Sequence, residues 1–587
     1  MPDRVLVLGN DSRSFLAVIR SLGRQGLEVH AAHASPAEPA LASRYVARVH
    51  PLPDHDLDPD GWLAALRQVL SCIRFALVVP CNDQSILPLQ ANRAELATLA
   101  PLYLLPAATQ DLVNNKQRTT ALARQLGIPV PREITPAQAG DVRGAVLTLG
   151  LPLVVKPVTS FRLHALRQKQ LVRRVHSEAE LERLLRALAD VEVVLQEDVP
   201  GTGVGLEALA YEGDILYAFQ HERVHEPPGG GGSSYRCSVP LDGELLQASQ
   251  RLLRALRYTG VAMVEFRQDR RRGAWVLLEI NGRFWGSLPL AVAAGADFPF
   301  YLYEMLVRGR REFPPGYRIG IYARNLTGDA AFLWQQLRSG QLHRRLPGLL
   351  LEMRHLLLGR ERLDTLTLDD PAPALAELRS LERQAATALA SRLSWSAYQL
   401  PWLRTYQRRR MRAHLGSARR ILFVCKGNIY RSPFAAAWAR QRWPDRSIQS
   451  AGYQAEPGRP SPRAAVEAAA RQGVDLRSHR ARLLEGAMLT WAEAILTFDR
   501  EGWRLLWSCH PQVRPRLHLL AEVPDPDGGT VEECAASYSL IQSAVDALLS
   551  APAPPAGRCS SAPAPHLRGA AEIGPFPGAG WPSADPS

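Results

Sequence analysis

One segment constrains this chain more than any other: a strand-like run that passes through a short loop into a helix. Four apolar residues, 421–424, are typical of a buried strand, and the sequence Cys-Lys-Gly-Asn-Ile-Tyr-Arg follows them. Ser432 and Pro433 then suit the N-cap and the first position of a helix, which an alanine-rich stretch continues. The loop is therefore expected at a helix N-terminus, where amide N–H groups and the helix dipole favour an anion.

Within this loop, five residues separate Cys425 from Arg431, a spacing that lets the loop close around one phosphoryl group. The helix N-terminus and Arg431 are expected to lower the pKa of the Cys425 thiol, so that a nucleophilic thiolate exists at neutral pH. Arg431 can hold two phosphate oxygens in a planar fork, and Gly427 is expected to supply unusual backbone angles. The alternative is a buried structural cysteine, but the agreement of strand, loop, arginine and helix favours catalysis.

The segment resembles the low-molecular-weight protein tyrosine phosphatase family, whose phosphate-binding loop reads V-C-x-G-N-x-x-R-S. Residues 424–432 read Val-Cys-Lys-Gly-Asn-Ile-Tyr-Arg-Ser in this chain. The resemblance extends through residues 450–452, 458–460, 479–482, 495–499 and 524–526, and ends with Tyr538. It implies a Rossmann-like α/β phosphatase domain with a central parallel sheet.

The resemblance implies a two-step reaction that needs no cofactor. Cys425 attacks phosphorus in line while Arg431 and the loop amides hold the equatorial oxygens. Asp525 protonates the leaving phenolate and then activates the water that hydrolyses the phosphocysteine. The alternative for Asp525 is an ordinary turn aspartate. The implied phosphate-binding loop comprises Lys426, Gly427, Asn428, Ile429, Tyr430 and Ser432, with Ser450 and His479 in support.

Several positions depart from the family pattern. Tyr430 stands where the family often carries a second cysteine, which excludes a protective disulfide with the nucleophile. Asp527 and Gly528 stand where aromatic residues often follow Asp-Pro, so a preference for phosphotyrosine stays open. Arsenate reductases share the fold but use two further cysteines that lie close together. Cys509 and Cys534 are far apart in the sequence, which argues against arsenate reduction.

The N-terminal residues alternate strand and helix patterns. Strands are predicted at residues 5–9, 27–32 and 75–80, and a helix is predicted at 15–26. This alternation predicts an α/β domain with a parallel sheet. The first strand ends at a glycine, but no G-x-G-x-x-G follows it, so no dinucleotide site is predicted.

The next region, residues 105–310, mixes helices and strands in an α+β pattern. A helix is predicted at 116–126, a loop at 227–234, and strands at 153–156, 193–197, 207–211, 262–266 and 275–280. Lys116 opens the helix and Lys156 ends the first of these strands, so two lysines from separate segments could neutralise a polyphosphate. A hinge between two lobes is predicted at Gln196, Glu197, Asp198 and Val199.

Two later strands carry a candidate metal site. Glu265 lies on one strand, while Glu279 and Asn281 close the next and project to one face, because strand side chains alternate with a period of two. Two carboxylates and an amide oxygen match Mg²⁺, which prefers hard oxygen ligands shared with phosphates. Arg283 follows on the same face and can stabilise charge on a transferring phosphoryl group.

Together and in this order, these features resemble the ATP-grasp superfamily with a preceding α/β domain, as in carboxylate–amine ligases. The closest run combines residues 264–266 with residues 279–287. The resemblance implies that ATP activates a carboxylate as an acylphosphate, which an amine then attacks. Lys116, Lys156 and the hinge would bind ATP, Glu265, Glu279 and Asn281 would bind Mg²⁺, and Arg283 would steady the acylphosphate. Arg223 and residues 229–234 are weaker candidates for substrate contact.

We therefore predict five segments in one multidomain α/β chain. They are a pre-ATP-grasp domain (1–104), an ATP-grasp domain (105–310), a basic helical linker (311–416), a phosphatase domain (417–551) and a disordered tail rich in proline and alanine (552–587). This interpretation is a ligase fused to a phosphatase. The alternative is a regulatory protein whose first part senses ATP or a metabolite and controls the phosphatase.

Composition sets the expected surroundings. The net charge of +13 is compatible with a nucleic-acid or membrane partner, but sites for anionic substrates and a basic linker explain it better, and no specific nucleic acid is expected. Seven scattered cysteines without a C-x-x-C motif, and the lack of a long apolar run, favour a cytoplasmic protein with no transmembrane segment. The expected partners are small carboxylates, amines, and a phosphoprotein or small phosphomonoester.

Overall fold

The computed structural model describes residues 2–11, 13–35, 37–167, 169–188, 191–226, 232–269, 273–338 and 342–549. The chain divides into two compact units. The first comprises most of residues 1–381, and the second comprises most of the described residues from 382 onward. Most of the predicted 227–234 loop and the whole predicted tail lie outside the described residues.

The first unit opens with a four-stranded parallel sheet in the order β3-β2-β1-β4. Its strands are β1 (Arg4–Leu8), β2 (Glu28–His33), β3 (Val46–Pro51) and β4 (Leu77–Pro80). The predicted parallel α/β arrangement is confirmed. Strand β3 was not predicted, because its sequence includes an arginine and a histidine and shows no regular apolar alternation.

Two further sheets follow. A four-stranded antiparallel sheet has the order β5-β8-β6-β7, and a seven-stranded sheet has the order β13-β12-β9-β10-β11-β14-β15. The strands of the first are β5 (Glu133–Ile134), β6 (Leu153–Pro157), β7 (Arg173–Val175) and β8 (Val193–Glu197). Those of the second are β9 (Thr202–Tyr211), β10 (Asp214–His225), β11 (Tyr235–Ser238), β12 (Gly260–Asp269), β13 (Ala274–Asn281), β14 (Tyr322–Arg324) and β15 (Glu361–Leu363).

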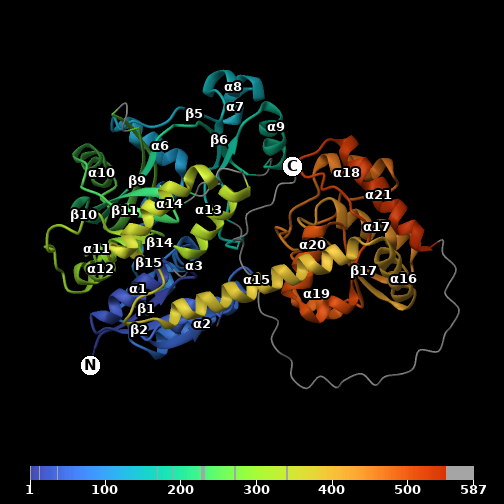
Figure 1. Cartoon of the computed structure of the whole chain (residues 1–587), viewed down its shortest axis with the longest axis horizontal. Coiled ribbons are helices and arrows are strands. Elements are labelled where there is room, and N and C mark those ends of the chain that lie inside the picture. Colours follow the sequence, from blue (N-terminus) through green and yellow to red (C-terminus); the bar gives the residue numbers. More distant parts are fainter. Residues whose placement is uncertain are drawn as a thin grey trace. The chain divides into compact units, whose positions relative to one another are not determined.

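The helices up to residue 357 connect and cover these sheets (Figure 1). They are α1 (Ser14–Arg24), α2 (Pro59–Cys72), α3 (Asp83–Ala91), α4 (Arg93–Leu96), α5 (Ala107–Asn114), α6 (Lys116–Gln125), α7 (Pro136–Ala139), α8 (Val142–Leu149), α9 (Glu178–Ala187), α10 (Gly243–Ala255), α11 (Leu288–Ala294), α12 (Phe298–Val307), α13 (Leu326–Arg338) and α14 (Leu342–Leu357), with a 3-10 helix η1 (Pro39–Ala42).

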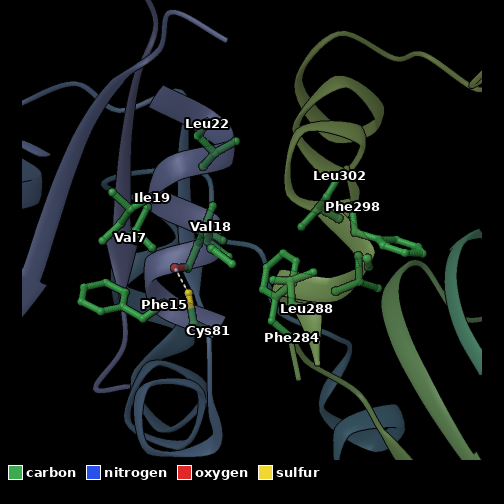
Figure 2. Packing of buried hydrophobic residues seen from close by; sticks show 14 of the residues in the cluster. Val7, Phe15, Val18, Ile19, Leu22, Cys81, Phe284, Leu288, Phe298 and Leu302 are labelled. Atoms are coloured by element: carbon green, nitrogen blue, oxygen red, sulfur yellow. Dashed lines mark hydrogen bonds between the residues drawn. The ribbon is translucent and has the colours of Figure 1, made fainter. Parts of the chain in front are cut away.

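The largest core of the first unit joins the parallel sheet to the later helices. One side of α1 packs on β1, and its other side faces α11 and α12, as Figure 2 shows for Val18 and Leu288. Phe15, Val18, Phe284, Leu288 and Phe298 are all almost fully buried in this cluster. Burial of side chains of this size stabilises a fold by roughly 1.5–3 kcal/mol each. The two predicted N-terminal domains therefore share one core.

The predicted helical linker contains two strands that belong to the first unit. β14 pairs with β11, and β15 pairs in parallel with β14, so both extend the seven-stranded sheet. Each strand has three residues with a charged side chain among them, which leaves no alternating apolar pattern to detect. Buried ion pairs fix the chain beyond them, because Arg20 pairs with Asp370 and Arg236 pairs with Asp364.

The second unit is built on a four-stranded parallel sheet in the order β17-β16-β18-β19. Residues alternate between its faces, because Ile421 and Phe423 join one core while Leu422 and Val424 join the other. The strands are β16 (Arg420–Cys425), β17 (Ser447–Gly452), β18 (Ala494–Thr497) and β19 (Leu517–Leu519). The predicted Rossmann-like sheet is confirmed.

Helices cover both faces of this sheet. α17 contacts α21, which also contacts α18 (Figure 1). The helices are α16 (Pro401–Ser417), α17 (Arg431–Arg442), α18 (Arg463–Arg471), α19 (Gly486–Trp491), α20 (Arg500–Cys509) and α21 (Val531–Leu549), with a 3-10 helix η2 (Pro511–Arg516). α15 (Ala372–Gln399) runs from the first unit into the second.

No single helix among the described residues has the length and apolar composition needed to cross a membrane. One bent pair, α11 with α12, meets both criteria jointly.

Candidate functional sites

The predicted phosphate-binding loop lies between the end of β16 and the start of α17. The helix begins at Arg431, two residues earlier than expected, and Tyr430 at its N-cap position makes no side-chain capping hydrogen bond. The prediction that Ser432 caps the helix is therefore wrong. Its hydroxyl oxygen instead lies 3.0 Å from the Cys425 sulfur and donates to the carbonyl of Ala451. This hydroxyl is thus positioned to hydrogen-bond the nucleophile.

Asn428 holds the loop in shape. It has a φ of 52°, whereas Gly427 has no positive φ, so the prediction that Gly427 provides the unusual angles is wrong. Asparagine tolerates the left-handed region better than most residues. Its side chain donates to the Ser432 hydroxyl at 2.8 Å and accepts from the Arg482 amide at 2.8 Å. His479 Nε2 lies 2.7 Å from its carbonyl oxygen.

Gly452, at the end of β17, lets this loop lie directly against the sheet. A Cβ atom at this position would lie 2.6 Å from the Lys426 carbonyl oxygen and 2.8 Å from the Asn428 nitrogen. Neither backbone atom can move without opening the loop. The absence of a side chain at position 452 is therefore a condition for the observed loop geometry.

Arg431 is the central cation of the site and only 2% of its side chain is exposed. Its Nη1 donates to Asp499 at 2.6 Å and to the Val523 carbonyl at 3.1 Å, while its Nη2 donates to Asp525 at 2.5 Å. Its buried Nε has no hydrogen-bond partner among the residues that the structure describes. The Nε–H group of the guanidinium thus remains for a phosphate oxygen.

Asp499 is a functional residue that the sequence analysis did not single out. It caps α20 by accepting from the Gly502 amide at 2.7 Å, and it also orients Arg431. The sequence could have predicted the capping role, because an aspartate directly after a buried strand and before a helix is a typical N-cap. The second role needed the tertiary fold, which brings β18 beside β16.

The charges of the site differ from the sequence expectation. Burial raises the pKa of the Cys425 thiol, and Asp525 adds to this, although Arg431 and Ser432 act in the opposite direction. This direction differs from the lowered thiol pKa expected from the sequence, because burial outweighs the effect of Arg431. Burial also raises the pKa of Asp525, with Asp527 and Asp499 contributing. A proton on Asp525 would remove one negative charge facing the thiol.

Tyr430, which replaces the second cysteine of many relatives, connects the loop to the segment after Asp525. Its side chain is buried, and its hydroxyl oxygen accepts from the Gly528 amide at 3.3 Å. The two sequence departures at positions 430 and 528 are thus in contact. The remaining loop residues, Lys426, Gly427 and Ile429, complete the loop between Cys425 and Tyr430.

In the first unit, the three predicted metal ligands lie together. Glu265 on β12 stands opposite Glu279 on β13 in the strand register. The Asn281 side-chain nitrogen lies 3.3 Å from a carboxylate oxygen of each glutamate. The amide NH2 group of Asn281 thus lies between the two carboxylates. Two carboxylates and an amide oxygen thus lie close together, and this set of hard oxygen donors fits Mg²⁺.

Arginines surround these ligands. Arg223 on β10 donates to Glu265 at 2.6 Å, and Arg283 donates to Asn281 at 3.2 Å. Arg283 also pairs with Asp83 of α3 at 2.7 Å. The predicted reaction-centre arginine is therefore fixed by the N-terminal sheet domain, which the sequence pattern did not indicate.

Both predicted lysines reach this site. Burial lowers the pKa of Lys156, and Lys116 donates to the Ser160 hydroxyl at 3.0 Å. Burial alone would raise the pKa of Glu279, but Lys116 and Lys156 bring it below its ordinary value. Burial and Arg283 lower the pKa of Lys169, a third lysine that the sequence analysis missed. It lies in an irregular segment between β6 and β7 without a recognisable motif.

The predicted hinge residues have different surroundings. Gln196 is buried and shares a face of its sheet with Lys156, because Val154 pairs with Gln196 and is two residues from Lys156. Glu197 pairs with Arg132 at 2.7 Å, and Asp198 pairs with Arg174. Val199 follows the end of β8. The side chains of Glu197 and Asp198 are therefore already engaged by arginines.

Comparison with known proteins finds matches in both units of the chain. A family model for "Low molecular weight phosphotyrosine protein phosphatase" matches residues 420–553, and one for "ATP-grasp in the biosynthetic pathway with Ter operon" matches residues 189–328. The "Probable low molecular weight protein-tyrosine-phosphatase EpsP" of Ralstonia nicotianae is 37% identical over 132 residues, which cover 22% of this chain and 91% of that protein. The phosphatase Wzb of Escherichia coli K12 is 31% identical over 21% of this chain and 87% of its own length.

A solved L-amino acid ligase from Bacillus licheniformis is 20% identical, with a TM-score of 0.41, over 52% of this chain and 74% of its own. Through its C-terminal unit the chain belongs to the low molecular weight phosphotyrosine protein phosphatase family. The same polypeptide also carries a region, residues 189–328, that matches the ATP-grasp family model.

Proposed function

We propose that the second unit hydrolyses phosphomonoesters through a phosphocysteine on Cys425. The sulfur attacks phosphorus, the bond to the ester oxygen breaks, and Asp525 gives its proton to the leaving oxygen. Water then attacks the phosphocysteine, Asp525 takes one of its protons, and inorganic phosphate leaves with the thiolate restored. The observation that carries this proposal is the convergence of Cys425, Ser432 and the partly unpartnered Arg431 around one loop.

Two residues keep the reacting groups in place in this proposal. Arg431 exchanges part of its contact with Asp499 and Asp525 for the phosphoryl oxygens, which frees Asp525 to face the leaving group. Asn428 keeps its amide 3.3 Å from the Cys425 sulfur, where it can stabilise the thiolate. Such preorganised donors lower the barrier without reorganising during the reaction.

The proposed substrate class of the phosphatase is based on the residues at the rim of the site and on Asp525. Asp527 is exposed beside Asp525 and adds negative charge, whereas Tyr430 is buried and offers no open aromatic face. Aryl phosphates, with tyrosine phosphate among them, fit the acid chemistry of Asp525. A comparison of kcat/KM for phenyl phosphate, phosphotyrosine peptides and alkyl phosphates tests this assignment. Faster turnover of alkyl than of aryl phosphates would contradict it.

For the first unit, we propose an ATP- and Mg²⁺-dependent ligase that activates a carboxylate and joins it to an amine. The carboxylate oxygen attacks the γ-phosphorus and ADP leaves; the amine then attacks the carbonyl carbon and phosphate leaves. Lys116 and Lys156 would bind phosphates, with Gln196 and Val199 beside the base. Glu265, Glu279 and Asn281 would hold Mg²⁺, which when bound neutralises phosphate charge. Arg283, fixed by Asp83, would stabilise the acylphosphate.

The observation that supports this second proposal is the contact of Asn281 with both Glu265 and Glu279 at 3.3 Å. Lys116 and Lys156 act on the same site, because they lower the pKa of Glu279. The test is ADP release from Mg·ATP with paired libraries of acids and amines. Stimulation that requires both an acid and an amine supports a ligase. Tight binding of ATP without any stimulated turnover would support a sensing module instead.

A further inference from the structure

Two arginines of the first unit form a cluster that the proposed ATP and Mg²⁺ sites do not use. Arg236 lies on β11 and is completely buried, and Arg13 directly precedes α1. Both contact Asp364, which follows β15: Arg236 Nη2 lies 2.5 Å from Oδ1, and Arg13 Nε lies 3.5 Å from Oδ2. The cluster therefore joins three segments that are far apart in the sequence.

Several N–H donors of these two arginines have no hydrogen-bond acceptor among the described residues. Arg236 uses Nη2 for Asp364 and for the Gly286 carbonyl at 3.3 Å, but its Nε and Nη1 have no hydrogen-bond partner among the described residues. Arg13 donates through Nη2 to the Ser233 carbonyl at 3.0 Å, and its buried Nε likewise lacks a hydrogen-bond partner there. A buried charged donor without an acceptor costs folding free energy. An anionic ligand that accepts these hydrogen bonds would remove that cost.

The cluster also carries excess positive charge. Within the described residues, Asp364 is the one carboxylate that pairs with either arginine. Burial raises the pKa of the neighbouring Glu207 carboxyl and lowers the pKa of His221, and these two side chains lie 3.0 Å from each other. The nearby Asp11 is engaged by the amides and hydroxyl at the start of α1. Burial and Arg236 together lower the pKa of Arg13 to about 10, as expected when two cations lack a second anion.

The cluster is reachable and close to the reaction centre. Arg13 keeps 26% of its side chain exposed, so one side opens to solvent. A Cβ at Gly286 would lie 2.9 Å from the Arg13 guanidinium carbon, so the glycine leaves space for that group. Arg13 senses the charge of Arg223, which pairs with the predicted metal ligand Glu265. Arg223, beside the predicted metal ligand Glu265, therefore lies near enough to influence the charge of Arg13.

We propose that Arg13 and Arg236 bind a carboxylate of the ligase substrate other than the one that ATP activates. The acid that the ligase uses is then a short dicarboxylic acid, or an amino acid derivative with two acidic groups. Planar guanidinium groups with free N–H donors match a carboxylate, and burial makes each such contact strong. This inference rests on the proposed ligase function for the identity of the substrate, but the anion site itself does not depend on turnover.

The test uses the full chain and compares Arg13→Gln with Arg24→Gln, an exposed arginine of α1 that pairs with Asp369. ADP release from Mg·ATP is measured against a library of monocarboxylates, dicarboxylates and phosphate esters. We expect the active acids to carry two carboxylates, and we expect Arg13→Gln to raise their KM about tenfold or more, since a hydrogen bond to a charged group is worth at least about that factor. In Arg13→Gln, the kcat and the KM for ATP should stay within about threefold of the wild-type values. Arg13→Lys should restore part of the lost affinity for the acid. Arg24→Gln should have the same kinetic constants as the wild type.

Active monocarboxylates, or an unchanged KM in Arg13→Gln, would overturn the inference while leaving the ligase proposal intact. If Mg·ATP binds but no acid is turned over, the ligase proposal fails, and succinate and inorganic phosphate then probe the cluster by calorimetry. Succinate binding that Arg13→Gln abolishes supports the carboxylate site. Binding of phosphate alone, or no difference between wild type and variant, contradicts it.

Discussion

The two candidate sites of this chain are built in opposite ways. The phosphatase site takes most of its groups from one continuous loop, with Asp499, Asp525 and His479 added around it. The ligase site takes single side chains from six or more segments, from Asp83 on α3 to Asn281 on β13. A loop site depends on local backbone geometry, whereas a dispersed site depends on the whole core that holds its segments together. A substitution in one site should therefore reduce the activity of that site and leave the other activity unchanged.

Cys425→Ser is expected to give the largest difference between its effects on the two activities. The hydroxyl is a far weaker nucleophile than the thiolate, so turnover of phenyl phosphate should fall by at least about 10⁴-fold. Release of ADP by the first unit should not change. The measurement is steady-state kinetics of both reactions on one preparation, with Cys509→Ser, a cysteine that takes no part in the loop, as the matched control. Equal loss in both cysteine variants would contradict a specific role for Cys425.

The next largest effect is expected from Asp525→Asn, which removes the proton donor. With phenyl phosphate, kcat should fall by about 10²–10³-fold. The pKa of Asp525 is raised, so wild-type kcat should be lost as the pH rises through that pKa, because the acid form disappears. The variant should lack this alkaline limb.

Asp527→Asn is the control for that experiment. It should keep the alkaline limb but shift it to lower pH, because Asp527 helps to raise the pKa of Asp525. A full pH–rate profile of all three proteins checks both statements. An alkaline limb that persists in Asp525→Asn would assign the acid to another group.

In the other site, Glu279→Gln should lower acid-stimulated ADP release by roughly 100-fold, a loss typical for one charge-stabilising group. The glutamate balances Lys116 and Lys156, so its removal also leaves two lysines without their main counter-charge. Phosphatase activity should be unaffected. Glu312→Gln, an exposed residue of the same unit, is the control. Loss of both activities would mean that the two units do not function separately.

The sequence and the structure agree best where function is local. The motif from Val424 to Ser432 predicted the strand, the loop and the helix, because each signal concerns neighbouring residues. It did not predict that Arg431 would contact two carboxylates, nor that burial would outweigh the effect of Arg431 on the pKa of Cys425. It also placed the strained backbone at Gly427 rather than Asn428.

Where function is dispersed, the sequence indicated the residues but not their surroundings. Lys116, Lys156, Glu265, Glu279 and Asn281 were placed by their positions at element ends. Pairs between distant segments, such as Arg283 with Asp83 or Arg13 with Asp364, have no local pattern and were missed. The helical linker was overestimated for the same reason, because its two short strands are defined only by their partners.

The smallest effect is expected from Tyr430→Phe. The change removes the acceptor of the Gly528 amide but keeps the buried ring, so the free energy of unfolding of the second unit should fall by about 1 kcal/mol. The kcat/KM for phenyl phosphate should fall by about threefold or less, since the contact orients the Asp525 segment only indirectly. Denaturant titration and kinetics measure the two effects. A fall as large as that of Asp525→Asn would make Tyr430 a direct participant.

The central claim is that Cys425 receives the phosphoryl group, and rapid-quench mass spectrometry of Asp525→Asn with p-nitrophenyl phosphate tests it most directly. Nitrophenolate leaves readily without an acid, whereas hydrolysis of the adduct needs the lost base. We predict a burst of nitrophenol equal to the amount of protein, together with one added phosphoryl group on the peptide that contains Cys425. Turnover without a burst, or a phosphoryl group on any other residue, would contradict the account.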